Sequence, residues 1–118
     1  MASTEAASLQ LIESYGTSGF MVSGTLHARS ILVFPERTLE WTGEITEAGL
    51  AEVVGHGMID ILLLGCGRRM ALVPPVLRQS LRTAGIVIDA MDTGAACRTY
   101  NLLLGEERRV AAALIKLA

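Results

Sequence analysis

The feature that most constrains the fold is a strand–helix–strand pattern in the second half of the chain. Residues 59–64 are apolar almost throughout, which is typical of a β-strand covered on both faces. Residues 74–85 begin with two prolines and end with a glycine, as expected of a helix, and residues 86–90 predict a second buried strand. Two strands joined by a helix predict a parallel pair with a right-handed crossover.

The first forty residues favour β-structure without helices. Glycine or proline separates several short apolar or β-branched runs, which predicts a meander of hairpins. These runs lie at residues 20–22, 25–27, 30–34 and 37–41.

Two further helices are predicted around this framework. One begins at Thr46, whose hydroxyl can cap the first turn, and ends at Gly57. The other covers residues 106–117, which begin with acidic residues and carry a lysine near their end, matching the helix dipole. The expected inward-facing residues of the two helices are Leu50, Val53, Val54, Val110, Leu114 and Leu117.

Asp-Thr-Gly at residues 92–94 follows an apolar strand, as it does in the catalytic loop of aspartic proteases. Such a protease needs a second carboxylate that shares a proton with the first, and a strand after the catalytic turn. Here the following residues favour a helix. We therefore expect Asp92 or Thr93 to cap a helix that runs through Leu103.

Cofactor and metal sites are not indicated. The Gly-x-Gly at residues 65–67 follows an apolar strand, but Met70 stands where the dinucleotide fingerprint requires glycine. The histidines and cysteines are not at the spacing of metal ligands. The sequence therefore predicts no cofactor, no metal and no catalytic set.

Length and composition favour one domain over residues 1–118, with residues 1–11 as a candidate disordered tail. Half of the chain is apolar (51%), so it can form a core without disulfides. No apolar run reaches the ~18 residues of a membrane span, and the first residues lack the order of a signal peptide. These features predict a soluble cytoplasmic protein that does not insert into membranes, with a monomer slightly favoured.

Charge is distributed unevenly along the chain. Residues 1–60 carry two basic and eight acidic residues, a net charge of −6, whereas residues 61–118 carry eight basic and four acidic residues, a net charge of +4. This split suits a protein partner, and we expect Arg78 and Arg82 to present a basic surface to it. The overall net charge of −2 argues against nucleic acid.

A small-anion niche is the alternative site. Ligands of open α/β sheets bind beyond the carboxyl ends of the strands, where glycines, arginines and a helix start would meet. The residues expected there are Gly65, Cys66, Gly67, Arg68, Asp92 and Thr93.

Five ordered motifs resemble the small Mth-domain family, largely of unknown function, which includes a mitochondrial assembly factor for respiratory complex I. They are SYGTSGFMVSG, SILVFP, IDILLLGCG, PPVLRQSLRTAGI and MDTGAACRTYNLLLGEERRVAAALI. The resemblance implies an α/β fold of three layers: a central mixed sheet, helices on one side, and β-hairpins plus a helix on the other. It implies no catalytic residues, and family members commonly have threonine where Cys66 stands.

The resemblance favours a non-enzymatic interaction or assembly role, such as the assembly of a respiratory complex or another membrane protein. The alternative is a small-molecule or anion-binding protein, or an enzyme, that uses the niche at the strand ends.

Overall fold

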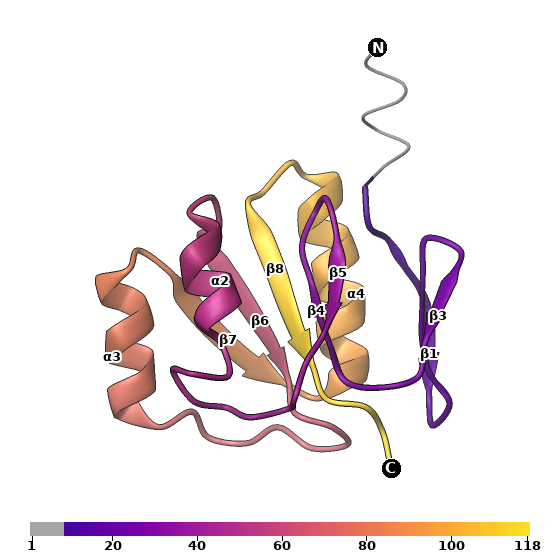
Figure 1. Cartoon of the computed structure of the whole chain (residues 1–118), viewed down its shortest axis with the longest axis horizontal. Helices are drawn as coiled ribbons and strands as arrows, with labels where there is room; N and C mark the ends of the chain where they lie inside the picture. The colour runs from indigo at the N-terminus through magenta and orange to yellow at the C-terminus, as the bar shows by residue number, and fades with distance from the viewer. Residues whose placement is uncertain (1–8) are drawn as a thin grey trace.

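A mixed five-stranded sheet forms the middle of three layers (Figure 1) in the computed structural model, which describes residues 9–118. The strand order is β5-β4-β8-β6-β7. Strands β6, β7 and β8 are mutually parallel, and β4 is antiparallel to both β5 and β8. The strands are β4 (Ile31–Val33), β5 (Thr38–Glu40), β6 (Ile61–Gly65), β7 (Val87–Met91) and β8 (Val110–Leu114).

The predicted parallel pair is confirmed. Helix α3 (Pro75–Thr83) connects β6 to β7, with Pro74 at its N-cap and Gly85 in the left-handed region (φ 81°) just beyond its end. The register pairs Leu62 with Ile88.

The predicted helix over residues 106–117 is wrong, because residues 110–114 form strand β8. All five residues of β8 are buried, since β4 and β6 flank it in the sheet and both faces are covered. Alanine is the strongest helix former, but intrinsic propensity is a weak influence, and burial in a central strand overrides it. A short apolar run of this kind has no hydrophobic periodicity that distinguishes a strand from a helix.

Helices α2 (Ala51–His56) and α3 cover one face of the sheet (Figure 1), over a core that includes Leu50, Val53 and Leu81. Helix α2 is shorter than expected. The Thr46 hydroxyl accepts from the Gly49 N–H in a turn that precedes the helix. Val54, predicted to face inward, is exposed.

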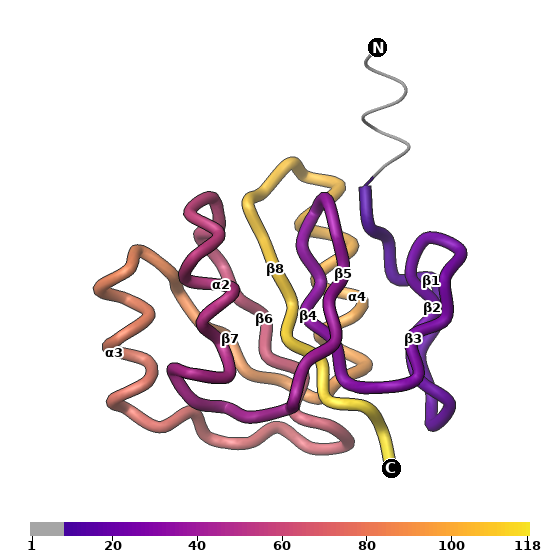
Figure 2. Tube along the Cα trace, viewed as in Figure 1, coloured from indigo at the N-terminus to yellow at the C-terminus, as the bar shows by residue number. Residues whose placement is uncertain are grey.

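The opposite face carries helix α4 (Thr93–Gly105) and a separate three-stranded sheet, as the predicted layer of hairpins plus helix requires. That sheet consists of β1 (Ile12–Gly16), β2 (Gly19–Val22) and β3 (Thr25–His27). Figure 2 shows it standing beside α4, apart from the central sheet. The expected meander is therefore divided between two sheets, and β1 was not predicted.

The side chain of Asn101 on α4 forms hydrogen bonds to the backbone of this small sheet. Its Oδ1 accepts from the Ile12 N–H at 3.0 Å, and its Nδ2 donates to the Ile12 carbonyl at 2.8 Å. Of the expected tail, residues 1–8 lie outside the described part of the chain. Residues 9–11 are held in place, because the Gln10 N–H donates to Pro35 O and the Leu11 N–H donates to the Ser23 hydroxyl.

Candidate functional site

Thr93 joins the carboxyl ends of three chain segments. It is fully buried, and its hydroxyl donates to Ile115 O at 2.7 Å and accepts from the Gly67 N–H at 2.8 Å. Its backbone N–H donates to Gly67 O at 2.7 Å, and the Ile115 N–H donates to Gly65 O at 2.9 Å. We call Gly65, Gly67, Thr93 and Ile115 the strand-end junction.

Asp92 caps helix α4, so the predicted cap is confirmed. Its Oδ1 accepts from the Ala95 N–H at 2.9 Å, and its carboxylate lies at the positive end of the helix dipole. Asp-Thr-Gly therefore begins a helix, with Asp92 as the cap and Thr93 in the junction.

The residues of the predicted anion niche do meet at one edge of the sheet, but their donors are already used. Gly67 and Thr93 bond to each other, and the Cys66 N–H donates to Met91 O at 2.9 Å. The Cys66 thiol lies 3.8 Å from Leu64 O. The junction itself thus leaves these backbone donors no capacity for a ligand, and anion binding by the niche stays a prediction.

Open space lies directly beside the junction. A cavity of about 200 Å³ is lined by Tyr15, Arg68, Gly94 and Arg98, with Gly67, Asp92 and Leu117 completing the wall. We call it the arginine cleft. Arg98 Nη1 donates to the Tyr15 hydroxyl at 2.7 Å, and Arg68 Nη2 donates to Ala118 O at 2.8 Å.

Gly94 is required for this arrangement, because a Cβ there would lie 2.6 Å from the Tyr15 hydroxyl oxygen. Sequence reasoning missed Tyr15 and Arg98. Tyr15 belongs to β1, which lies far away in the sequence, and only the packing of β1 on α4 brings it to this edge.

The predicted partner surface is not one free basic face. Arg82 is exposed, whereas Arg78 is half-buried and donates from Nη1 to Ile88 O at 2.9 Å. Strand β7 is an edge strand rather than the buried strand predicted, and Val87 is exposed on it. Arg78 therefore covers part of an open sheet edge, a role that sequence alone did not indicate.

Residues 68–76 form what we call the exposed segment, which runs from the strand-end junction into the first turn of helix α3. It carries three large apolar side chains in solvent: Met70 (59% exposed), Leu72 (90%) and Val76 (75%). Its two arginines, Arg68 and Arg69, are also exposed.

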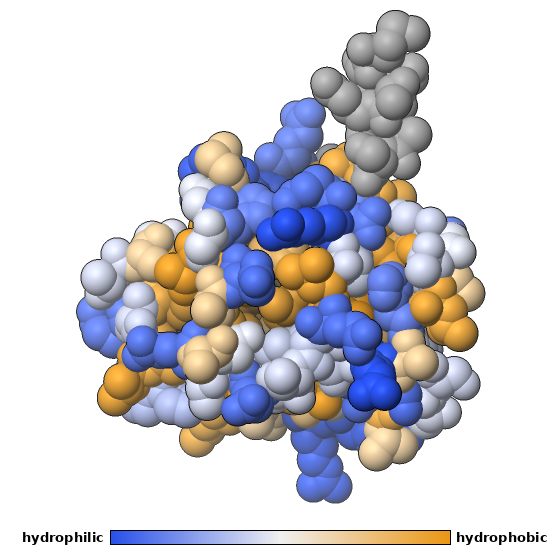
Figure 3. All heavy atoms as spheres, in the orientation of Figure 1, coloured by the Kyte–Doolittle hydropathy of each residue, from blue (hydrophilic) through white to orange (hydrophobic). Residues whose placement is uncertain are grey.

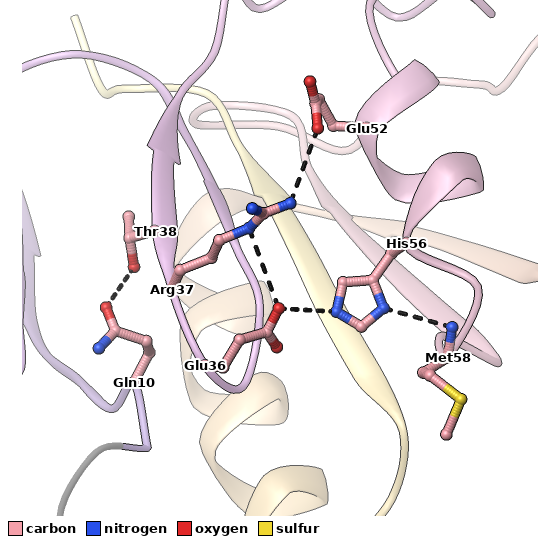
Figure 4. A network of polar contacts seen from close by, with 7 residues as sticks. All are labelled: Gln10, Glu36, Arg37, Thr38, Glu52, His56 and Met58. Atoms are coloured by element: carbon pink, nitrogen blue, oxygen red, sulfur yellow. Dashed lines mark hydrogen bonds and ion pairs between the residues drawn. The ribbon is translucent and has the colours of Figure 1, made fainter.

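A polar network lies between the β4–β5 turn and α2 (Figure 4). The Arg37 guanidinium stands between two carboxylates, 3.8 Å from Glu52 and 3.9 Å from Glu36. Glu36 Oε2 also lies 2.8 Å from His56 Nε2, and His56 Nδ1 accepts from the Met58 N–H at 3.2 Å. Because Nδ1 is an acceptor, Nε2 carries the proton that is donated to Glu36.

The His56 ring also packs on an aromatic side chain. It stacks on Phe34 with centroids 5.0 Å apart, and both of its ring nitrogens form hydrogen bonds within the chain. A mostly apolar cavity of about 490 Å³ lies beside it, lined in part by Leu9, Met58 and Leu104.

Cys97 is not a candidate nucleophile. Both cysteines are free, and burial raises the pKa of the Cys97 thiol to about 12, so it stays protonated at neutral pH. Within residues 9–118, no group of three or more histidine, cysteine or acidic residues could hold a metal ion. No helix in the same range is long and apolar enough to cross a membrane.

Comparison with known proteins identifies the family of this chain. Residues 12–115 match the family described as "Protein of unknown function (DUF498/DUF598)". The chain belongs to this family. An uncharacterised protein of Rhodobacter capsulatus is 38% identical over 104 residues, which cover 88% of this chain and 82% of that one.

Two other similar proteins support the predicted resemblance and fold. A solution NMR structure of a Bordetella pertussis protein, described as a Mth938-like domain, has a TM-score of 0.77 and 32% identity, covering 92% of this chain and 86% of that one. NADH dehydrogenase [ubiquinone] 1 alpha subcomplex assembly factor 3 of Xenopus tropicalis is 32% identical over 116 residues. The match covers 94% of this chain but only 63% of the assembly factor.

Proposed function

We propose that this protein is a non-enzymatic interaction protein that helps to assemble a respiratory complex, with subunits of an NADH dehydrogenase as its clients. The observation that carries the proposal is the 32% identity to the Xenopus assembly factor over 94% of this chain. The human assembly factor of the same name is also 32% identical, over the same share of this chain.

The described residues add physical support. The Cys97 thiol is protonated, so it supplies no activated group. The exposed segment instead presents apolar side chains and arginines to solvent, which suits contact with another protein.

The test combines capture and deletion in cells that express the protein. Tagged protein should enrich NADH dehydrogenase subunits over a tag-only control, measured by quantitative mass spectrometry. Deletion of its gene should lower the amount of assembled complex on a native gel, and re-expression should restore it. Normal assembly in the deletion strain together with no enriched subunit would contradict the proposal.

A second candidate function is the binding of a small anion in the arginine cleft. The specific observation in its favour is that two guanidinium groups, from Arg68 and Arg98, line one cavity beside the first turn of α4. Tyr15 adds a hydroxyl that can accept or donate.

Thermal shift tests this candidate with phosphate, nucleotides and simple carboxylates. A ligand at a hundredfold excess over its Kd should raise stability by about 2.7 kcal/mol. The shift should vanish in Arg98→Ala and persist in the control Arg69→Ala, whose side chain does not line the cleft. A shift that survives Arg98→Ala, or no shift with any of these anions, would rule out the cleft as an anion site.

A further inference from the structure

The exposed segment is unusual because buried neighbours hold its apolar side chains out in solvent. Val73 and Leu77 are only 7% and 3% exposed, and they anchor the backbone on either side of Pro74. Leu72 and Val76 lie next to these anchors and point into solvent instead of joining the core. In Figure 1 the segment runs along the lower edge of the molecule, where the arrowheads of β6, β7 and β8 end.

Apolar surface is visible at this end of the molecule. Figure 3 shows apolar side chains at the lower left, over α3 and the segment that leads into it. The Leu72 side chain is 90% exposed, so a partner that covers it would bury nearly all of its apolar area, which favours binding.

The local charge is of one sign. Residues 61–88 contain four arginines and no aspartate, glutamate or lysine. None of these four arginines forms an ion pair within the described residues. Three of them, Arg68, Arg69 and Arg82, are exposed, so their charge is available to an acidic surface.

The composition also matches that of protein interfaces. The cores of such interfaces are enriched in methionine and arginine and depleted of lysine, glutamate and aspartate, which is the composition of this segment. A lipid surface is less well matched, because the segment carries two arginines, fewer than the clusters of about four to eight basic residues that bind anionic headgroups.

We propose that the exposed segment is a docking surface for an acidic segment of a partner protein, whose apolar side chains cover Met70, Leu72 and Val76 while its carboxylates face Arg68 and Arg69. The inference rests on the proposed interaction role and specifies where the partner binds. The partner is defined by its chemistry: apolar residues flanked by aspartate or glutamate.

Site-specific photo-crosslinking tests the contact directly. A benzophenone amino acid replaces Leu72 in the full-length chain, expressed in its native cells. The matched control places the same amino acid at Leu102 on α4, which is 61% exposed. Position 72 should yield a crosslinked protein that position 102 does not, and the crosslinked peptide should be rich in acidic and apolar residues.

Affinity then separates the two kinds of contact. For the crosslinked protein, purified, Leu72→Ser with Val76→Ser should raise Kd at least about tenfold, because the buried apolar area is lost. The control Leu102→Ser should change Kd less than about twofold. Arg69→Glu should slow association and reduce its salt dependence, since exposed charges mainly steer encounter.

The outcomes are distinct. If NADH dehydrogenase subunits are captured equally well by Leu72→Ser with Val76→Ser, the proposed function stands and the docking surface is elsewhere. If the crosslinked peptide is basic, or position 72 crosslinks no protein, the inference is overturned. If the wild type binds vesicles of phosphatidylcholine and phosphatidylglycerol through Leu72 without any protein crosslink, the segment is a lipid contact and the inference also fails.

Discussion

The strand-end junction and the exposed segment are consecutive in the chain but opposite in character. Gly65 and Gly67 are buried, and their backbone groups bond to Thr93 and Ile115. Immediately after them, residues 68–76 turn large apolar side chains into solvent. One loop thus contains both a buried, hydrogen-bonded corner of the fold and Leu72, the most exposed large apolar side chain of residues 9–118.

The difference shows that, in a small domain, the residues that stabilise the fold can be distinct from those that are exposed to a partner. Substitutions in the junction remove buried hydrogen bonds or space, so they act on stability. Substitutions of Met70, Leu72 or Val76 in the exposed segment remove contacts that the isolated chain does not make, so they act on partner binding.

Within this comparison of the two regions, the largest loss of stability is expected at Gly65. A Cβ there would lie 3.0 Å from Thr93 Cα and 3.2 Å from Ala96 Cβ, and the remaining methyl groups of valine have no space in a buried strand end. Gly65→Val should lower the free energy of unfolding by about 3 kcal/mol, the upper end for overpacking. Gly16→Val is the control, because nothing lies within 4 Å of its Cβ. Equal denaturant midpoints for the two variants would contradict the close packing at Gly65.

Thr93→Val should have the next largest effect. Valine has nearly the same shape but leaves the Gly67 N–H and the Ile115 carbonyl without their partner in a buried position. The expected loss is about 2 kcal/mol, measured by denaturant titration. Thr93→Ser, which keeps the hydroxyl, should recover more than half of it. If serine and valine are equally destabilising, the hydroxyl is not what holds the junction.

Asp92→Ala should cost about 1 kcal/mol, the usual value for a lost N-cap. The carboxylate satisfies the Ala95 N–H and interacts favourably with the dipole of α4. Asp92→Asn should be nearly neutral by comparison, because an amide oxygen can still accept that bond. An asparagine variant as unstable as the alanine one would mean that charge, and not the hydrogen bond, makes the cap.

The smallest effect is expected in the exposed segment. Leu72→Ser should change the free energy of unfolding by less than about 0.5 kcal/mol, since the side chain is already 90% exposed. Thermal and denaturant unfolding both measure it. A loss comparable to that of Thr93→Val would mean that Leu72 packs within the chain, and the contrast between the two regions would disappear.

Local signals in the sequence were enough to predict the parallel pair of strands β6 and β7. The apolar run of β6 and the prolines before α3 act over a few residues, and the Asp92 cap follows from the helix that comes directly after it. The resemblance to the Mth-domain family supplied the three layers, which the structure confirms.

The rest depends on long-range contacts. Strand β8 could not be told from a helix, because only its place between β4 and β6 determines its conformation. The arginine cleft needs Tyr15 beside Arg98, 83 positions apart, and the burial of Arg78 depends on β7 being an edge strand. Nothing in a single sequence specifies these pairings.

The contact between Arg78 and Ile88 limits the growth of the sheet. The Val87 N–H and the Met91 carbonyl bond toward β6, so the intervening Ile88 carbonyl points to the open side of β7. The Arg78 guanidinium donates to the Ile88 carbonyl and so occupies an acceptor that another strand would need. Without Arg78 this acceptor would be open to β7 of a second copy, so this one side chain helps to keep two copies from pairing along β7.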